Sequence, residues 1–191
     1  MESTNYINSV NLNQNTDFPY LVLNVINGNS YPRNPGFRVM HWHEDIQFIY
    51  VLDGEIDVVT LEKRTTLHKG EGFFINKNVV HLIDKVDVCH YNSFIFPDYF
   101  LRFYTGSPAE PIVNQIIGRE DFPVFPILKT NGNASVLQLL KKLSKKEFIF
   151  FKICIQYFRY MHIIWHIIYN YTHFIIPFKY SGFVDTTFLL N

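Results

Sequence analysis

The stretch that decides the fold of this chain covers residues 37–83 and reads FRVMHWHEDIQFIYVLDGEIDVVTLEKRTTLHKGEGFFINKNVVHLI. His41 and His43 lie one residue apart in a run of β-branched and aromatic residues, which is typical of a strand. Side chains two positions apart on a strand point to the same face, so we expect both imidazoles on one face, with Gln47 at the same parity. His81 comes from a later strand, and we expect it to join them in one cavity.

Turn signals divide the chain into short strands at regular spacing. The strongest is Asp53-Gly54, the dipeptide most typical of a tight hairpin, which predicts a turn inside the stretch. Several short strands with turns between them predict a sandwich or a barrel, so the expected fold class is mainly β. The predicted strands cover residues 18–26, 37–43, 46–52, 55–61, 65–68, 72–76, 80–84 and 88–96.

Beyond Phe96 the pattern changes from strands to helices. Short helical segments are predicted at residues 97–104 and 109–118, and an extended segment at 121–128. From Ala134 onward, apolar residues recur at intervals of three or four, which predicts C-terminal α-helices. The residues of this pattern are Val136, Leu137, Leu139, Leu140 and Leu143, followed by Phe148, Phe151, Ile155, Phe158, His162, Trp165 and Tyr169.

The apolar run from Phe148 to Ile176 admits two interpretations, a membrane span or an amphipathic helix packed on the protein. It contains Lys152 and Arg159, and charged side chains are costly inside hydrocarbon. The pattern therefore favours the packed helix, and no membrane association is expected.

Composition narrows the function classes. The chain has 191 residues with 17 Lys and Arg against 17 Asp and Glu, so nothing in its charge attracts a polyanion. Cys89 and Cys154 do not have the spacing of a metal site. Residues 1–17 lack the basic start and apolar core of a signal peptide, which indicates a cytoplasmic protein with reduced thiols and a polar, flexible N-terminal arm.

The order of these motifs resembles the cupin superfamily, a double-stranded β-helix or jelly-roll barrel. The first cupin motif is matched by Gly36, His41, His43, Gln47 and Gly54, with Gln where the family usually has Glu. The second is matched by Gly70, Phe73, Phe74, Ile75 and His81, with Lys77-Asn78 in place of the usual Pro-x-Gly turn. The resemblance implies a cupin barrel over residues 18–96, followed by C-terminal α-helices.

More narrowly, residues 41–56 and 67–83, together with YNSFIFP at 91–97, resemble the N-terminal effector-binding domain of the arabinose-regulator (AraC) family of transcription factors. This implies a connecting segment at 97–133 that packs on the barrel and a helical dimerisation segment and tail at 134–191, with a homodimer formed through the C-terminal helices. A full family member continues into two helix-turn-helix units, which this sequence lacks, so DNA binding by this chain alone is not expected.

The histidine set has two interpretations. One is a metal centre with His41, His43, Gln47 and His81 as ligands for Zn, Ni, Mn or Fe, in which the neutral amide binds more weakly than the usual carboxylate. The other is the polar lining of a pocket for a small-molecule effector, sugar-like or other, with Ile49 and Phe74 as apolar lining residues.

Two functions follow from the resemblance and stay open. The first is a non-catalytic effector-sensing and dimerisation domain of a transcription regulator, with the ligand inside the cupin barrel. The second is a metal-dependent cupin enzyme, an oxygenase or isomerase. Gln47 departs from the usual ligand set, and no general acid or base is evident beside it, so the sequence favours the sensor over the enzyme.

Overall fold

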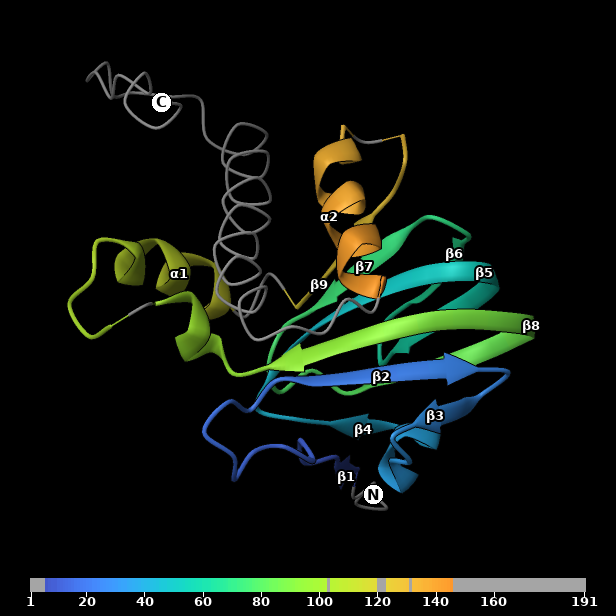
Figure 1. The fold of residues 1–191 in the computed structure, drawn as a ribbon, viewed down its shortest axis with the longest axis horizontal. Helices are drawn as coiled ribbons and strands as arrows, with labels where there is room; N and C mark the ends of the chain where they lie inside the picture. The colour runs from blue at the N-terminus through green and yellow to red at the C-terminus, as the bar shows by residue number, and fades with distance from the viewer. Residues whose placement is uncertain (1–5, 103, 120–122, 131, 146–191) are drawn as a thin grey trace.

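One curled β-sheet dominates the computed structural model, which describes residues 6–102, 104–119, 123–130 and 132–145 (Figure 1). Nine strands form it within these residues, with β1, β4, β8, β5, β7 and β9 in spatial order and β2, β3 and β6 attached at the sides. The strands are β1 Ile7–Asn8, β2 Leu21–Ile26, β3 Asn29–Tyr31, β4 His41–Trp42, β5 Ile46–Thr60, β6 Arg64–His68, β7 Gly72–Ile75, β8 His81–Phe96 and β9 Val124–Ile127. The helical elements are the 3-10 turns η1 Pro35–Arg38 and η2 Asp98–Leu101, and the α-helices α1 Ala109–Ile117 and α2 Ala134–Ser144.

Two long strands, β5 and β8, form the spine of the sheet. They pair antiparallel from Ile46 opposite Phe96 to Thr60 opposite His81. The other edge of β5 carries β7 and β6, and the other edge of β8 carries β2 and β4. The predicted mainly β fold is confirmed, and the sheet curls in the way expected of a cupin domain (Figure 1).

The hairpin predicted at Asp53-Gly54 is wrong. β5 continues through these residues with register shifts between Val51 and Asp53 and between Gly54 and Ile56, so they form a bulge inside a long strand. Gly54 has a φ of +71°, and a Cβ at this position would lie 1.9 Å from the carbonyl oxygen of Val88. Gly54 therefore allows β5 to bend and its backbone to approach that of β8 closely. Both features require the positive φ and missing side chain that also favour glycine in turns.

Two other strand boundaries also differ from prediction. The separate strands predicted at 80–84 and 88–96 are one strand, β8, because β5 supplies continuous pairing along it. The strand predicted at 37–43 is reduced to His41–Trp42, because residues 35–38 form η1 with Pro35 at its start. Proline fixes φ at a helical value and lacks the N–H that a strand would use.

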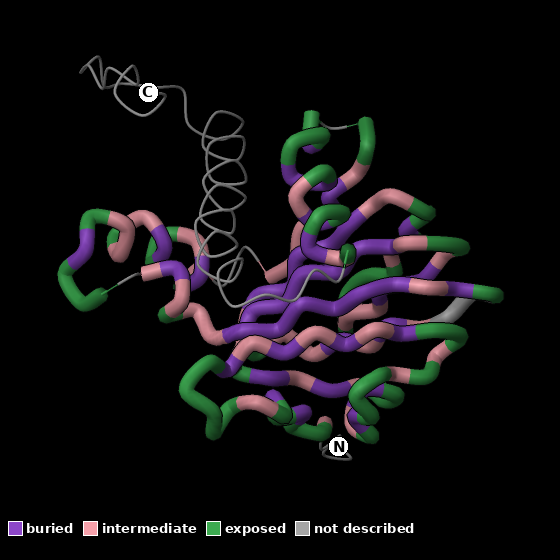
Figure 2. Tube along the Cα trace, viewed as in Figure 1, coloured by how far each residue is buried: buried purple, intermediate pink, exposed green. Residues whose placement is uncertain are grey.

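The sheet has a core on each face, as expected when side chains alternate along a strand. One face packs Leu23, Ile49, Val51, Phe73 and Ile95 inside the curl. The opposite face packs Phe48, Phe74 and Phe94 against the helices, and the central strands are buried along much of their length (Figure 2).

Helix α2 covers the second of these faces. The predicted apolar stripe is confirmed for Val136, Leu137, Leu140 and Leu143, which are buried, whereas Leu139 is partly buried. Leu140 packs so closely on β7 that a Cβ on Gly72 would lie 2.9 Å from its Cδ1 atom. The sequence element that ends the chain's described part is therefore fixed to the sheet by side-chain packing.

Several predictions fall on residues 146–191, outside the described residues. They are the helix from Phe148 to Ile176, the dimer contact and the environment of Cys154. Among the described residues, no helix combines the length and apolar character needed to cross a membrane.

Residues 6–17 belong to the predicted flexible arm, yet they contact the sheet. β1 pairs in parallel with β4, with Ile7 opposite His41, and the Ser9 backbone N–H donates to the Trp42 carbonyl at 2.8 Å. The buried Asn11 side chain donates to the Pro19 carbonyl at 3.0 Å and to the Asp45 carboxylate at 2.8 Å. Because of these bonds, the arm lies against the strand that carries the first histidine.

Candidate metal centre

Four of the predicted site residues meet inside the curled sheet. His41 in β4 lies opposite His81 at the start of β8, His43 follows β4, and Gln47 lies in β5. They are nearly inaccessible to solvent, with exposed fractions of 1% for His41, 3% for His43 and 0% for His81 and Gln47. One ring nitrogen from each histidine lies within 4.8 Å of the others, so the expectation that the histidines lie together holds.

The backbone fixes the orientation of all three rings. Each Nδ1 lies at hydrogen-bond distance from a carbonyl oxygen two residues away, that of Val39 for His41 (2.7 Å), Asp45 for His43 (2.8 Å) and Val79 for His81 (2.8 Å). A carbonyl only accepts, so Nδ1 carries the proton in each ring and a neutral ring has its lone pair on Nε2. Metal-binding histidines are commonly oriented by this kind of second hydrogen bond.

The side chain of Gln47 lies between two of the rings. Its Oε1 atom is 2.8 Å from His43 Nε2 and 3.0 Å from His81 Nε2, and its amide nitrogen donates to Ser93 Oγ. With neutral rings these two contacts place an acceptor against an acceptor. Such contacts are favourable only when a cation or a donated proton lies between the atoms.

Two arrangements satisfy these atoms. In one, a divalent cation is shared by the ring nitrogens and the Gln47 oxygen, since ligands about 2.1 Å from an octahedral ion lie about 3 Å apart. In the other, the Gln47 amide is rotated by half a turn. Its two N–H groups then donate to His43 and His81, and its oxygen accepts from the Ser93 hydroxyl. The residues present therefore fit a metal ion, and they also have a satisfied arrangement of their own.

Burial keeps the rings of His41 and His81 neutral. Desolvation lowers the pKa of His41 to about 4, against an opposing hydrogen bond to Val39. Desolvation also lowers the pKa of His81 well below its ordinary value, with the neighbouring His41 and His43 as smaller causes. At neutral pH these rings therefore offer lone pairs without prior loss of a proton.

The other two predicted site residues are separated by the sheet. Ile49 has the parity of Gln47 and belongs to the core inside the curl. Phe74 does not join the histidines, because it lies opposite Phe48 on the helix-covered face, with 5.1 Å between their ring centroids. The neighbours of Phe74, Phe73 and Ile75, share the face of Ile49.

Ser93 and Asp45 contact the site and were not predicted. Ser93 is a small polar residue in an otherwise apolar, buried part of β8, and the alternation of side chains along the strand places it on the inner face. This signal was readable in the sequence. Asp45 lines a hollow of about 220 Å³ together with His43, Asn11 and Tyr99. Burial raises the pKa of Asp45, while its hydrogen bond from Asn11 lowers it. The hollow therefore lies beside the buried histidine cluster, and residues of the N-terminal arm form part of its lining.

Comparison with known proteins places a cupin domain over residues 32–86. These residues contain all four side chains of the cluster and the bulge at Gly54. The predicted cupin resemblance is therefore confirmed for this part of the chain.

One curated protein and several solved structures resemble parts of this chain. The HTH-type transcriptional regulator YdeC of Bacillus subtilis is 34% identical over 50 residues, which are 26% of this chain and 17% of that protein. Among solved structures, ToxT of Vibrio cholerae with a bound unsaturated fatty acid has 12% identity and a TM-score of 0.40, over 81% of this chain and 52% of that one. EutQ of Clostridium difficile has 22% identity and a TM-score of 0.27, over 28% and 43% of the two chains. This chain thus covers less than two thirds of each.

Proposed function

We propose that this chain is the effector-sensing part of a transcription regulator, and that its cupin domain holds a divalent transition metal at His41, His43 and His81. The match of residues 32–86 to the cupin domain and the local similarity to the regulator YdeC support this proposal. Zn, Ni, Mn and Fe all accept imidazole ligands. Gln47 would complete the set through its amide oxygen.

The observation that carries the proposal is the shared orientation of three buried imidazoles. Each donates its Nδ1 proton to a backbone carbonyl, which leaves the lone pair of every neutral ring on Nε2, the atom that would bind the metal. A pocket lining for an organic molecule does not require this coincidence. A bound metal would supply a positive charge that attracts oxygen donors of an effector.

The arm offers a route by which the site affects the rest of the molecule. An effector in the hollow beside His43 would compete with the hydrogen bond from Asn11 to Asp45. Loss of that bond weakens the attachment of residues 6–17 to the sheet, while β1 remains paired beside His41. A ligand that binds one arrangement of the arm better than the other shifts the population between them.

The test is the metal content of the purified protein, measured by elemental analysis without added metal and after titration. We expect about one divalent ion per chain in the wild type and its loss in His81→Ala, because the imidazoles share one coordination sphere. His68→Ala is the matched control, since His68 lies on the exposed surface of β6 beside Glu55. Unchanged metal content in His81→Ala would reject the ligand assignment and leave a metal-free pocket for an organic effector.

A second candidate is a metal-dependent oxygenase or isomerase. It is favoured by Asp45, a carboxyl group with a raised pKa that lines the hollow beside His43 and has the properties of a proton acceptor. Oxygen uptake or isomer formation by the metal-loaded protein, lost in Asp45→Asn, would establish the enzyme. Binding without turnover would support the sensor.

A further inference from the structure

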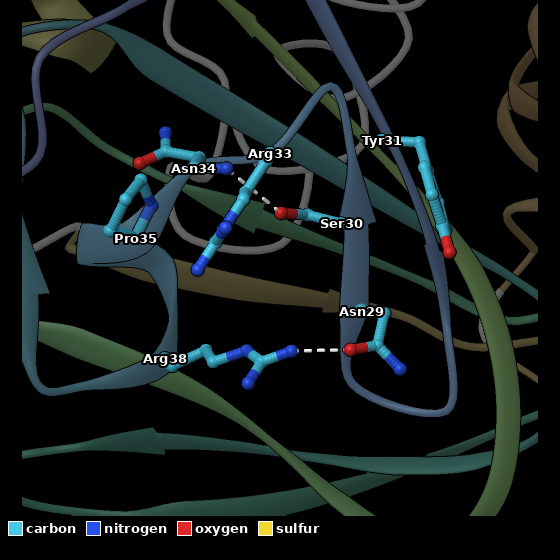
Figure 3. Close-up of a pocket in the computed structure, with 7 residues that line it drawn as sticks. All are labelled: Asn29, Ser30, Tyr31, Arg33, Asn34, Pro35 and Arg38. Carbon is cyan, nitrogen blue, oxygen red and sulfur yellow. Dashed lines mark hydrogen bonds between the residues drawn. The ribbon is translucent and has the colours of Figure 1, made fainter.

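A second hollow lies on the outer surface, away from the histidines. It is formed between β3 and η1 and has a volume of about 390 Å³ (Figure 3). Arg33 and Arg38 line it together with the hydrogen-bonding side chains of Asn29, Ser30 and Asn34. None of the described residues that line it has a carboxyl group.

The two guanidinium groups lack carboxylate partners among the described residues. Neither Arg33 nor Arg38 forms an ion pair with a described Asp or Glu, and Arg38 instead donates to the Asn29 side-chain oxygen. Figure 3 shows Arg33 and Arg38 extending into the same space between the strand and the turn. Two cations that face one hollow without an acid repel each other mildly, and an anion between them would remove that repulsion.

The frame around the hollow is held in place by its own contacts. Asn34 is buried, its backbone N–H donates to Ser30 Oγ at 3.0 Å, and its side-chain oxygen accepts from Ser9 Oγ at 3.5 Å. Pro35 begins η1 and restricts its backbone, while β3 is paired with β2. The two arginines therefore extend from a restrained turn rather than from a free loop.

From this juxtaposition we propose that the hollow binds a small oxyanion, a carboxylate or phosphate group, between Arg33 and Arg38. Guanidinium groups match the spacing of such oxygens and donate two parallel hydrogen bonds to them. The amide group of Asn29 and the hydroxyl group of Ser30 would contact the remaining part of the bound ligand. A hollow of about 390 Å³ accommodates a small organic acid or a phosphorylated metabolite. Both arginines are solvent-exposed, so the affinity falls as salt screens the charges.

The experiment is titration of the 191-residue protein with inorganic phosphate and, separately, with citrate at low ionic strength. Binding is followed by isothermal calorimetry and by NMR resonances of the arginine Nε–H groups. We expect saturable binding of at least one probe and a rise in Kd of about tenfold or more in Arg33→Gln and in Arg38→Gln. The probe that binds more tightly identifies the phosphate or the carboxylate as the preferred group.

Lys63→Gln is the matched control, because it removes the same charge from an exposed position on the turn between β5 and β6. It should leave Kd unchanged. Linear shifts without saturation, or an equal loss in Lys63→Gln, would overturn the proposal. Circular dichroism of each variant shows that the loss does not come from unfolding.

Discussion

At the residue scale, we propose that Gln47 sets the affinity of the histidine cluster for a cation. Its amide is neutral, and it has an alternative use as a donor to His43 and His81 that requires no metal. A cation must therefore displace a satisfied hydrogen-bond arrangement before it binds. This competition lowers the affinity for metal relative to a site with a carboxylate at the same position.

The first prediction concerns Gln47→Glu. The added negative charge lies beside three imidazoles in a buried site, so we expect divalent metal affinity to rise by at least about tenfold, measured by competition with a chromophoric chelator. Gln115→Glu adds the same charge on the exposed surface of α1 and should have no effect. Equal affinities of Gln47→Glu and wild type would show that this side chain does not act as a ligand.

The second prediction concerns pH and the buried imidazoles. Burial lowers the pKa of His41 to about 4. As the pH falls below about 6.5, this imidazole is therefore protonated in the unfolded chain while it stays neutral in the folded chain. Stability is therefore complete above pH 6.5 and falls as the pH decreases toward 4. His41 alone would account for roughly 3 kcal/mol of this loss, and His81 adds to it.

Urea unfolding at pH 7, 5.5 and 4.5, with a chelator present, measures this loss. His68→Gln is the control and should keep the full pH dependence, because His68 is exposed. The acids with lowered pKa, Asp53 and Asp57, titrate below this window and do not mimic the effect. A free energy of unfolding that stays constant from pH 6.5 to 4.5 would contradict the predicted role of burial.

At the element scale, the bulge in β5 sets the curvature of the sheet. Strands of this length twist and bend where an extra residue interrupts the ladder, and the shifts on both sides of Gly54 mark that point. The bend brings Thr60 of β5 beside His81, and His81 beside His41 of β4. The position of one glycine thus helps to bring the histidines together.

The third prediction compares two glycines with positive φ. Gly54→Ala should destabilise the fold by about 2 kcal/mol or more, because its Cβ would combine backbone strain with a collision against the Val88 carbonyl. Gly106→Ala has a similar φ of +80°, and beyond its chain neighbours no described residue has an atom within 4 Å of the added Cβ, so only the strain of about 1 kcal/mol applies. Urea midpoints report the difference. Equal losses in the two variants would show that the contact with Val88 is unimportant.

At the scale of the whole molecule, the two faces of the sheet have different neighbours. The inner face carries the buried histidines, and α2 lies over the outer face (Figure 1). Val113 and Ile117 of α1 belong to the same apolar cluster as the outer-face phenylalanines. The arm lies beside β4 and the inner-face site. Under the proposed sensing function, a ligand bound on the inner face would influence the arm and the elements beside it.

The fourth prediction is a homodimer formed through the segment that follows α2. The sequence predicts an apolar helix face in this segment, and such a face is too extensive to remain in water on a domain of this size. Sedimentation at micromolar concentration should show a dimer for the full chain and a monomer for a chain ending at Lys146. A soluble monomeric full chain would defeat this prediction. The predicted apolar face consists of Phe148, Phe151, Ile155, Phe158 and Trp165.

Local sequence patterns determined the elements with a clear period. The alternation around His41 and His43 predicted that both imidazoles lie on one side, and the leucine spacing of α2 predicted its buried face. The regular apolar segments also predicted a mainly β fold. These features depend on the geometry of a single strand or helix, which neighbouring residues in the sequence are sufficient to define.

Only the tertiary structure decided where those elements end and which partners they meet. The dipeptide Asp53-Gly54 is compatible with both a hairpin turn and a bulge. The pairing of β5 with an unbroken β8 selects the bulge. Phe74 points to the opposite face of the sheet from Phe73 and Ile75. Which of these faces meets the histidines depends on the pairing register of β7 with β5, and no local pattern contains that register. The contact of Gln47 with the ring of His81, which lies 34 residues further along the chain, arises in the same way. Contacts between distant residues are set by long-range packing and pairing, so they become visible only when the chain is folded.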